Sequence, residues 1–217
     1  MIETQQYVFT VEGETEAWYL KWLQDQINNY PNRKYKAFIK ADVNQSPKNY
    51  SKRFTAKSVP QITHLCDVEG EEQDNIDHFK KILSEMKTVK AQKGIVYILG
   101  YSNLTFELWM ILHKMDCYAP LNHKKHYLDF IRRAFDEQFE NLKQYKKESS
   151  FKKCLNKLTI EDVKSAIRRA ENIMTMNERN GKSQKKFNGY VYYQDNPALS
   201  VHEIVKKILI KCGVMSK

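Results

Sequence analysis

Residues 7–23 read YVFTVEGETEAWYLKWL, and this stretch decides the class of fold that we expect for the chain. Its first five residues are β-branched or aromatic, a run short enough for a buried strand. Gly13 ends the run, and apolar side chains then recur at helical spacing to about residue 28. A strand followed at once by an amphipathic helix indicates an α/β fold.

The same alternation of strand and helix continues through the first half of the chain. We expect strands at residues 35–41, 61–66 and 95–99, and helices at residues 75–90 and from Thr105 onward. Residues 42–60 are polar and predict a loop, with or without a short helix, and residues 100–103 predict a turn. Continuous apolar strands between amphipathic helices predict a parallel sheet that is covered on both faces.

The second half has a different character, because residues 123–180 contain no convincing strand and carry the densest charge. We expect two or three helices here, one of them starting at a capping box with Thr159 as the N-cap and Asp162 in place of the usual Glu. Residues 181–189 predict a flexible basic loop, residues 190–193 a short strand or extended segment, and residues 201–211 a final helix. The expected parts are an α/β core (1–115), a basic helical portion (116–195) and a C-terminal helix that packs back on the core (196–217).

The composition is that of a globular protein. The chain has 217 residues, of which 41% are hydrophobic and 29% charged, and this suits one α/β domain with an appendage. The 36 Lys and Arg residues exceed the 26 Asp and Glu residues and give a formal net charge of +10. This basic balance favours a polyanionic partner such as nucleic acid, but a lysine-rich solvated surface gives the same charge.

Cysteine usage and hydropathy bear on the compartment. The four cysteines form no CxxC pair, which argues against a zinc ribbon and for a reducing environment. The first residues lack the basic start and apolar core of a signal peptide, and no apolar run approaches the roughly 20 residues of a membrane helix. We therefore expect a cytoplasmic protein without a membrane partner.

Acidic side chains stand at the ends of three predicted strands. Glu12 follows the first strand, Asp67 and Glu69 follow the third, and Glu107 lies in the first turn of the helix after the fourth. Sites in open parallel sheets form outside the carboxyl ends of the strands, so these acids are expected to share one crevice. Glu16, four residues after Glu12, projects from the first helical turn toward the same place.

A group of carboxylates in one crevice points to divalent metal. Mg²⁺ and Mn²⁺ prefer oxygen ligands, and without a cation the acids would repel one another. Two cations would match the site that flanks an in-line phosphoryl displacement. Each acid also has a simpler explanation, since acids near helix N-termini complement the helix dipole and Asp67-Val68-Glu69 can be a polar turn. The joint arrangement favours the metal site.

Five further polar residues are candidates for contact with nucleic acid. Ser102 and Asn103 would position a phosphate or a metal-bound water, or they would simply form the turn and cap the next helix. Lys182, Lys185 and Lys186 suit a phosphate backbone, although a solvated basic loop has the same composition.

Three segments resemble, in order, the sequence elements of a known family. They are residues 11–20 (VEGETEAWYL), residues 102–109 (SNLTFELW) with His113, and residues 196–202 (NPALSVH). They are similar to the EGxTExxY, SNPxFExWxxxH and NPxxxVH elements of the RloB-like proteins, a branch of the Toprim superfamily related to the OLD-type nucleases. Two positions depart from the family pattern, since Glu69 replaces an Asp and Leu104 replaces a Pro.

The resemblance implies a Toprim-like parallel sheet flanked by helices, with a mainly helical C-terminal portion. It also implies Mg²⁺- or Mn²⁺-dependent nuclease chemistry and a role in bacterial anti-phage defence or restriction, often beside an AAA-type ATPase. By the family pattern Glu12 is the catalytic glutamate, Asp67 and Glu69 stand at the Asp-x-Asp position, and Glu107 is the helix-start acid.

These observations give two main hypotheses. The first is a metal-dependent nuclease for DNA or RNA with Glu12, Asp67 and Glu107 as catalytic residues, in which the basic half holds the nucleic acid. The alternative is a catalytically weak nucleic-acid-binding or ATPase-docking subunit, and the departure at Glu69 is its main support. Another Toprim-type phosphotransfer activity is a third reading, and a homodimer is compatible with each of them. The metal ligands in the first hypothesis are Glu12, Glu16, Asp67, Glu69 and Glu107.

Overall fold

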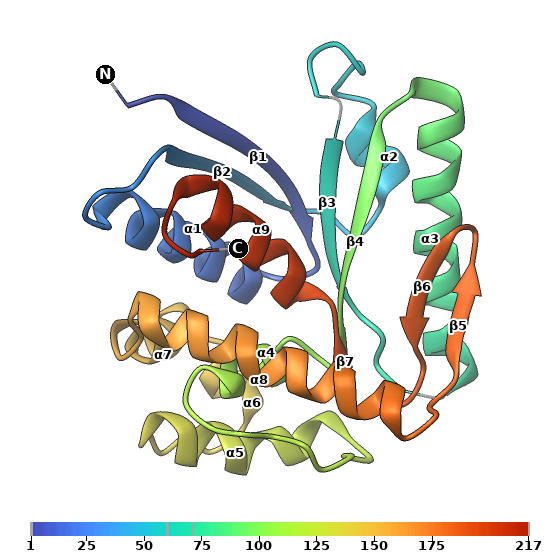
Figure 1. Ribbon diagram of the computed structural model, residues 1–217. Coiled ribbons are helices and arrows are strands. Elements are labelled where there is room, and N and C mark those ends of the chain that lie inside the picture. Colours follow the sequence, from blue (N-terminus) through green and yellow to red (C-terminus); the bar gives the residue numbers. More distant parts are fainter. Residues whose placement is uncertain (1, 60, 71, 217) are drawn as a thin grey trace.

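The computed structural model describes residues 2–59, 61–70 and 72–216. Its centre is a five-stranded sheet with the strand order β2-β1-β3-β4-β7 (Figure 1). The strands are β1 (Thr4–Val11), β2 (Lys36–Val43), β3 (Gln61–Asp67), β4 (Val96–Asn103) and β7 (Ala198–Leu199). Strands β1 to β4 run parallel, and β7 joins antiparallel at the end of β4, with Ser102 opposite Leu199. The expected α/β class is confirmed.

Helices cover both faces of this sheet. They are α1 (Glu14–Asn29), α2 (Pro47–Ser51), α3 (Gln73–Lys93), α4 (Glu107–Leu112) and α9 (Val201–Cys212). Successive strand side chains point to opposite faces. Phe9 and Val11 therefore pack in a hydrophobic cluster with α1, α4 and α9, while Val8 packs in a second cluster with α2 and α3.

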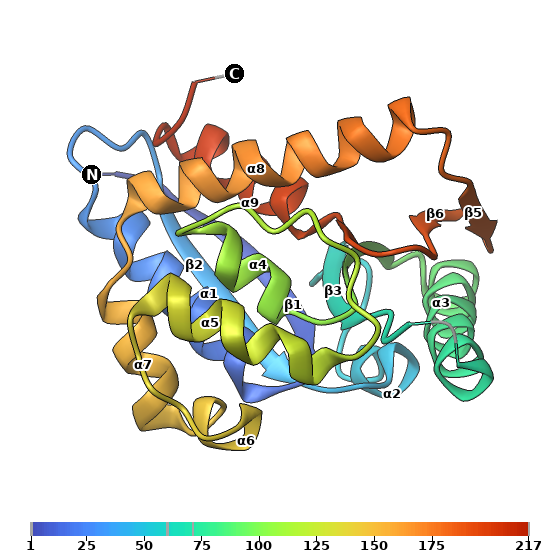
Figure 2. The same cartoon turned by 90° about the horizontal axis from the view of Figure 1, so that it is seen from below.

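The helical portion packs beneath the sheet in Figure 1 and beside α4 in Figure 2. It is richer in helices than the two or three expected, and Ile131, Phe151 and Ile167 share one cluster with Leu23 and Trp109 of the α/β part. None of the helices in the described ranges is both long and apolar enough to cross a membrane. The elements are a 3-10 turn η1 (Lys124–His126) and the helices α5 (Tyr127–Phe135), α6 (Leu142–Tyr145), α7 (Glu148–Asn156) and α8 (Ile160–Arg179). The predicted capping box at Thr159 is confirmed.

The turn predicted at residues 100–103 is wrong, because these residues continue β4. Asp67 of β3 lies opposite Ser102, and β7 pairs on the other side. Gly100 suggested a turn because glycine is common in turns, but the structure gives this glycine a packing role. A Cβ atom there would overlap the side chains of Leu65 and Ile204, so this glycine permits the close approach of α9 to the sheet.

The flexible loop predicted at residues 181–189 is also wrong, because most of it forms a β-hairpin. Strand β5 (Gln184–Phe187) pairs antiparallel with β6 (Tyr190–Tyr193). Asn188 and Gly189 make the turn with φ values of 52° and 90°. Asn-Gly at a two-residue hairpin turn was the available signal, and the polar sequence of β5 concealed it. The strand predicted at residues 190–193 is confirmed.

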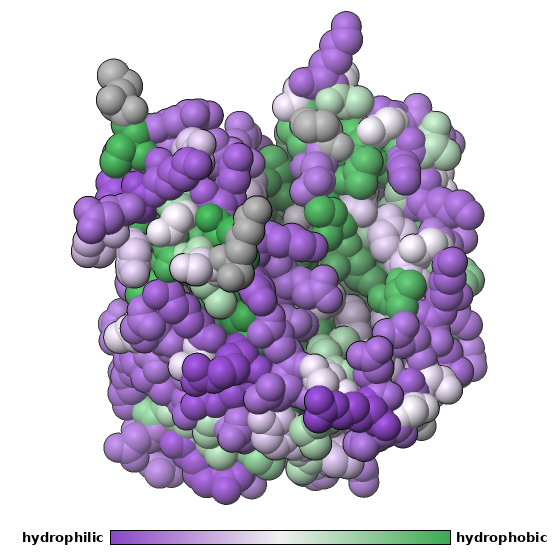
Figure 3. Space-filling model, viewed as in Figure 1, coloured by the Kyte–Doolittle hydropathy of each residue, from purple (hydrophilic) through white to green (hydrophobic). Residues whose placement is uncertain are grey.

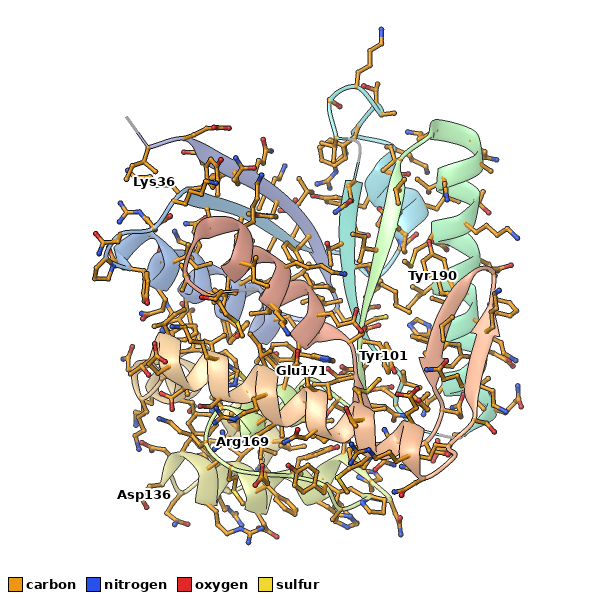
Figure 4. All side chains as sticks on the ribbon, viewed as in Figure 1. Lys36, Tyr101, Asp136, Arg169, Glu171 and Tyr190 are labelled. Carbon is orange, nitrogen blue, oxygen red and sulfur yellow. The ribbon has the colours of Figure 1, made fainter. Side chains whose placement is uncertain are left out.

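The hairpin stands beside the outer edge of β4 across a cleft of about 380 Å³. Tyr97 and Leu99 line it from β4, and the apolar surface here shows as green in Figure 3. Tyr101 and Tyr190 come from its two sides (Figure 4). The hydroxyl of Tyr101 accepts a hydrogen bond from the backbone N–H of Tyr193 at 3.1 Å, so a side chain helps to hold the hairpin against β4.

Buried polar contacts fix α4 relative to α1 and α8. The His113 ring pairs through Nδ1 with the carbonyl of Trp109 at 2.9 Å and through Nε2 with the Tyr19 hydroxyl at 3.1 Å. Burial lowers the pKa of His113 to about 4, so the ring is neutral, donates from Nδ1 and accepts at Nε2. Arg169, labelled on α8 in Figure 4, donates to the carbonyls of Leu112 and His113 at the end of α4.

The substitution Tyr19→Phe tests this contact. It leaves the buried Nε2 of His113 without its donor, so we expect the free energy of unfolding to fall by about 1–3 kcal/mol. Urea titration measures the change. Tyr35→Phe is the matched control, because the Tyr35 hydroxyl makes no hydrogen bond within the described residues. Equal stabilities of the two variants would contradict the assigned role.

Candidate functional site

The carboxyl ends of β1 and β3 bring Glu12 and Asp67 together. The backbone N–H of Asp67 donates to Glu12 Oε2 at 3.1 Å, which ties the two strand ends to each other. Glu16 lies in the first turn of α1, is 5% exposed and accepts a hydrogen bond from the Thr15 hydroxyl at 2.7 Å. Glu107 is the first residue of α4 and is 1% exposed. The gathering predicted from the strand ends is therefore present.

The electrostatics of Glu12 show how crowded this edge is. Burial, with the charges of Glu16 and Glu69 as further causes, raises the pKa of Glu12 from 4.5 to about 8. The hydrogen bond from the Asp67 amide and the charge of Lys146 act in the opposite direction. Glu12 thus holds its proton near neutral pH unless a cation is present.

Asp67 and Glu16 behave in the same way. Burial raises the pKa of Asp67 well above its usual range, and the charges of Glu12, Glu16 and Glu107 add to this effect. Burial also raises the pKa of Glu16, with Glu107 as a further cause. The pKa of each of these carboxyl groups is raised by the charge of at least one other acid of the cluster, so their titrations are coupled.

Lys146 is a member of this site that the sequence did not reveal. Its Nζ lies 2.9 Å from Glu107 Oε1. Burial opposes its charge, but Glu107, Asp67 and Glu16 outweigh that effect and raise the pKa of Lys146. The residue follows α6 in the helical portion. The Lys146-Lys147 pair was visible only as one of several basic pairs, and no local pattern places it beside Glu107.

Several buried polar atoms around the acids have no hydrogen-bond partner among the described residues. They include Glu107 Oε2, Ser102 Oγ and the hydroxyls of Tyr127 and Tyr145. Ser102 lies beside Asp67 in the sheet, and burial followed by the charge of Glu107 raises the pKa of Tyr145. Buried polar atoms are almost always satisfied, so a water or an ion is the expected partner of these atoms.

The side chains do not stand in a coordination geometry. Within residues 2–59, 61–70 and 72–216, no three His, Cys, Asp or Glu side chains converge on a common metal position. Four of the five acids have another partner instead, and Glu69 reaches Lys124 at 2.8 Å. The oxygen donors and the unpartnered Glu107 atom fit a divalent cation in chemistry, and side-chain rotation away from these partners is needed to bind it.

Three cavities join the acids to the helical portion. The first, of about 110 Å³, borders Glu12 and shares Glu69 and Asn75 with a second of about 190 Å³. The second shares Leu104 with a third of about 710 Å³, which reaches Lys182. Because neighbouring cavities share lining residues, the three lie in series from the acids to a basic side chain, and we call this series the groove.

The five polar residues predicted to contact nucleic acid fall into two sets. Ser102 and Asn103 are 1% and 0% exposed, and Asn103 donates to the carbonyls of Tyr193 and Gln194. They lie buried at the end of β4, beside β7. Lys182 lines the groove and donates to the Asn196 carbonyl at 3.2 Å. Lys185 and Lys186 are exposed on β5 and do not line the groove.

Fold and site together define an α/β protein with a partly buried carboxylate cluster at the carboxyl edge of a mostly parallel sheet. The family model described as RloB-like protein matches residues 7–208, which is most of the chain. The chain belongs to the RloB-like family. No curated protein and no solved structure gives a significant match.

The raised pKa of Glu12 predicts a pH-dependent stability. Between its ordinary value of 4.5 and about 8, the folded protein keeps a proton that the unfolded chain has released. The stabilisation is complete below the lower value and is lost as pH rises through the upper one. We expect the Tm of metal-free protein to fall across this range and the fall to be smaller in Glu12→Gln.

Thermal unfolding in a chelator at several pH values measures this effect. Glu14→Gln is the matched control, because Glu14 is exposed and lies only two residues further along the chain than Glu12. Identical pH slopes for the wild type and Glu12→Gln would contradict the shift.

Proposed function

We propose that this protein is a divalent-metal-dependent nuclease that cleaves phosphodiester bonds in DNA or RNA. One observation carries the proposal: acids from three strand ends form a cluster in which Glu107 is 1% exposed and its Oε2 has no partner among the described residues. Such a cluster is costly to bury unless protons or cations neutralise it. Membership of the RloB-like family supports a Toprim-type sheet and a role in anti-phage defence.

The residues of the cluster divide the work between them. Glu12, Asp67 and Glu107 hold Mg²⁺ or Mn²⁺, with Glu16 and Glu69 as further ligands. The bound cation supplies Lewis-acid polarisation of a phosphate oxygen. Without a cation the pKa of Glu12 is raised to about 8, so cation binding near neutral pH displaces the proton of this group.

Surface charge supports nucleic acid as the substrate. The formal net charge is +10, and the groove that starts at the acids continues to Lys124 and Lys182. Lysines along such a groove bind phosphates and release condensed counterions. Lys185 and Lys186 extend the basic surface on β5. The four cysteines are free and buried, which supports the cytoplasm as the compartment.

The nuclease proposal is tested by incubating the protein with plasmid, single-stranded DNA, total RNA and tRNA in Mg²⁺ or Mn²⁺. We expect cleavage of at least one substrate. Glu12→Ala and Glu107→Gln should each lower the rate at least about 100-fold, as expected when a group that acts in the transition state is removed. Gel electrophoresis over time measures the rate.

Glu14→Ala is the control, since its exposed side chain lies two residues from Glu12 but outside the cluster. Cleavage that survives Glu12→Ala unchanged would show that another centre is responsible.

The second candidate is a nucleic-acid-binding or ATPase-docking subunit, alone or as a homodimer. The observation in its favour is that no three acids of the described ranges converge on a metal position. Calorimetric titration with Mn²⁺ separates the two candidates. The nuclease predicts saturable binding that Glu12→Ala weakens, whereas a scaffold predicts no heat at millimolar metal and no effect of the substitution.

A further inference from the structure

The acidic cluster has two sides that differ in access. Glu12, Asp67 and Glu69 line the cavity of about 110 Å³ at the start of the groove. Glu16 and Glu107 do not line it and are 5% and 1% exposed. A hydrated metal ion entering from the groove therefore meets the first side, and the second side lies behind it.

The second side already has a cation of its own. The ammonium group of Lys146 lies 2.9 Å from Glu107 Oε1, and its charge also acts on Glu16 and Asp67. Two metal ions in a phosphoryl-transfer site stand about 3.5–4 Å apart, and a carboxylate that bridges them uses both of its oxygens. Glu107 has one oxygen engaged by Lys146 and only Oε2 free of a partner among the described residues.

Lys146 is held in place by buried neighbours. Tyr145, the preceding residue, is 0% exposed and packs edge-on against Phe139 and Phe151, with ring centroids 5.6 and 5.5 Å away. The backbone N–H of Lys146 donates to the Leu142 carbonyl at 2.9 Å. Its side chain is still 43% exposed. Packing in the helical portion therefore fixes the backbone of Lys146, and the ion pair with Glu107 places its ammonium group at the site.

We infer that Lys146 takes the place of a second metal, so that the site binds one divalent cation through Glu12, Asp67 and the free oxygen of Glu107. This inference rests on the proposed nuclease function, because it assumes that the cluster binds metal. Lys146 is then a positioning residue that neutralises Glu16 and Glu107 and prevents Glu107 from bridging two ions.

Calorimetric titration of Mn²⁺ into the full chain tests the stoichiometry. We expect one ion per wild-type chain and two per chain in Lys146→Met, because removal of the ammonium leaves Glu16 and Glu107 without their cation. Lys146→Gln is a second variant with a polar side chain. Lys147→Met is the matched control, since the adjacent exposed lysine makes no ion pair within the described residues, and it should bind one ion.

Thermal unfolding gives a readout that is independent of activity. Mn²⁺ should raise the Tm of Lys146→Met and Lys146→Gln more than the Tm of the wild type. Two ions in the wild type would overturn the inference and leave the nuclease proposal standing. One ion in both Lys146 variants, with the wild-type Tm shift, would do the same. Absence of binding in every protein would overturn both.

Discussion

The burial of like charges at one edge of the sheet is the constraint on which the rest of this structure depends. A buried carboxylate loses its hydration, and a second one nearby adds repulsion. Both effects raise the pKa of each group, so a bound proton or a cation is needed to neutralise the charge. Glu12, Glu16 and Asp67 all show this effect, and burial is its first cause in each. The backbone amide of Asp67, the Thr15 hydroxyl and Lys146 each offset part of it.

The fold holds these acids together through contacts that lie behind them. Glu16 lies in the first turn of α1 and Glu107 begins α4, and the Tyr19–His113 hydrogen bond fixes these two helices to each other. Arg169 of α8 holds the other end of α4. The helical portion is therefore part of the site's framework as well as its basic surface, and it supplies Lys146 and Lys124, whose ammonium groups pair with Glu107 and Glu69.

The sequence predicted what depends on local pattern and missed what depends on distant packing. Glu12, Asp67 and Glu107 were predictable because strand ends follow from apolar runs, and parallel strands align those ends. Gly100 was misread because its role comes from α9, which lies far along the chain. Lys146 carries no local signal, since its importance arises only when the chain after α6 places it beside Glu107. Strand β5 was not predicted because its residues are polar and mostly exposed, although the Asn-Gly turn that follows it is a hairpin signal.

Glu69 differs from the other acids of the cluster in its backbone and in its partner. Its backbone has a φ of 54°, an uncommon value for a residue other than glycine, and its amide donates to the Leu104 carbonyl. Its carboxylate pairs with Lys124 on the exposed wall of the groove. Glu12, by contrast, is bound to the Asp67 amide at the strand ends. An Asp at position 69 would have a shorter reach toward Lys124, so the extra methylene of Glu69 favours this ion pair. The contact between Glu12 and the Asp67 amide does not involve Glu69.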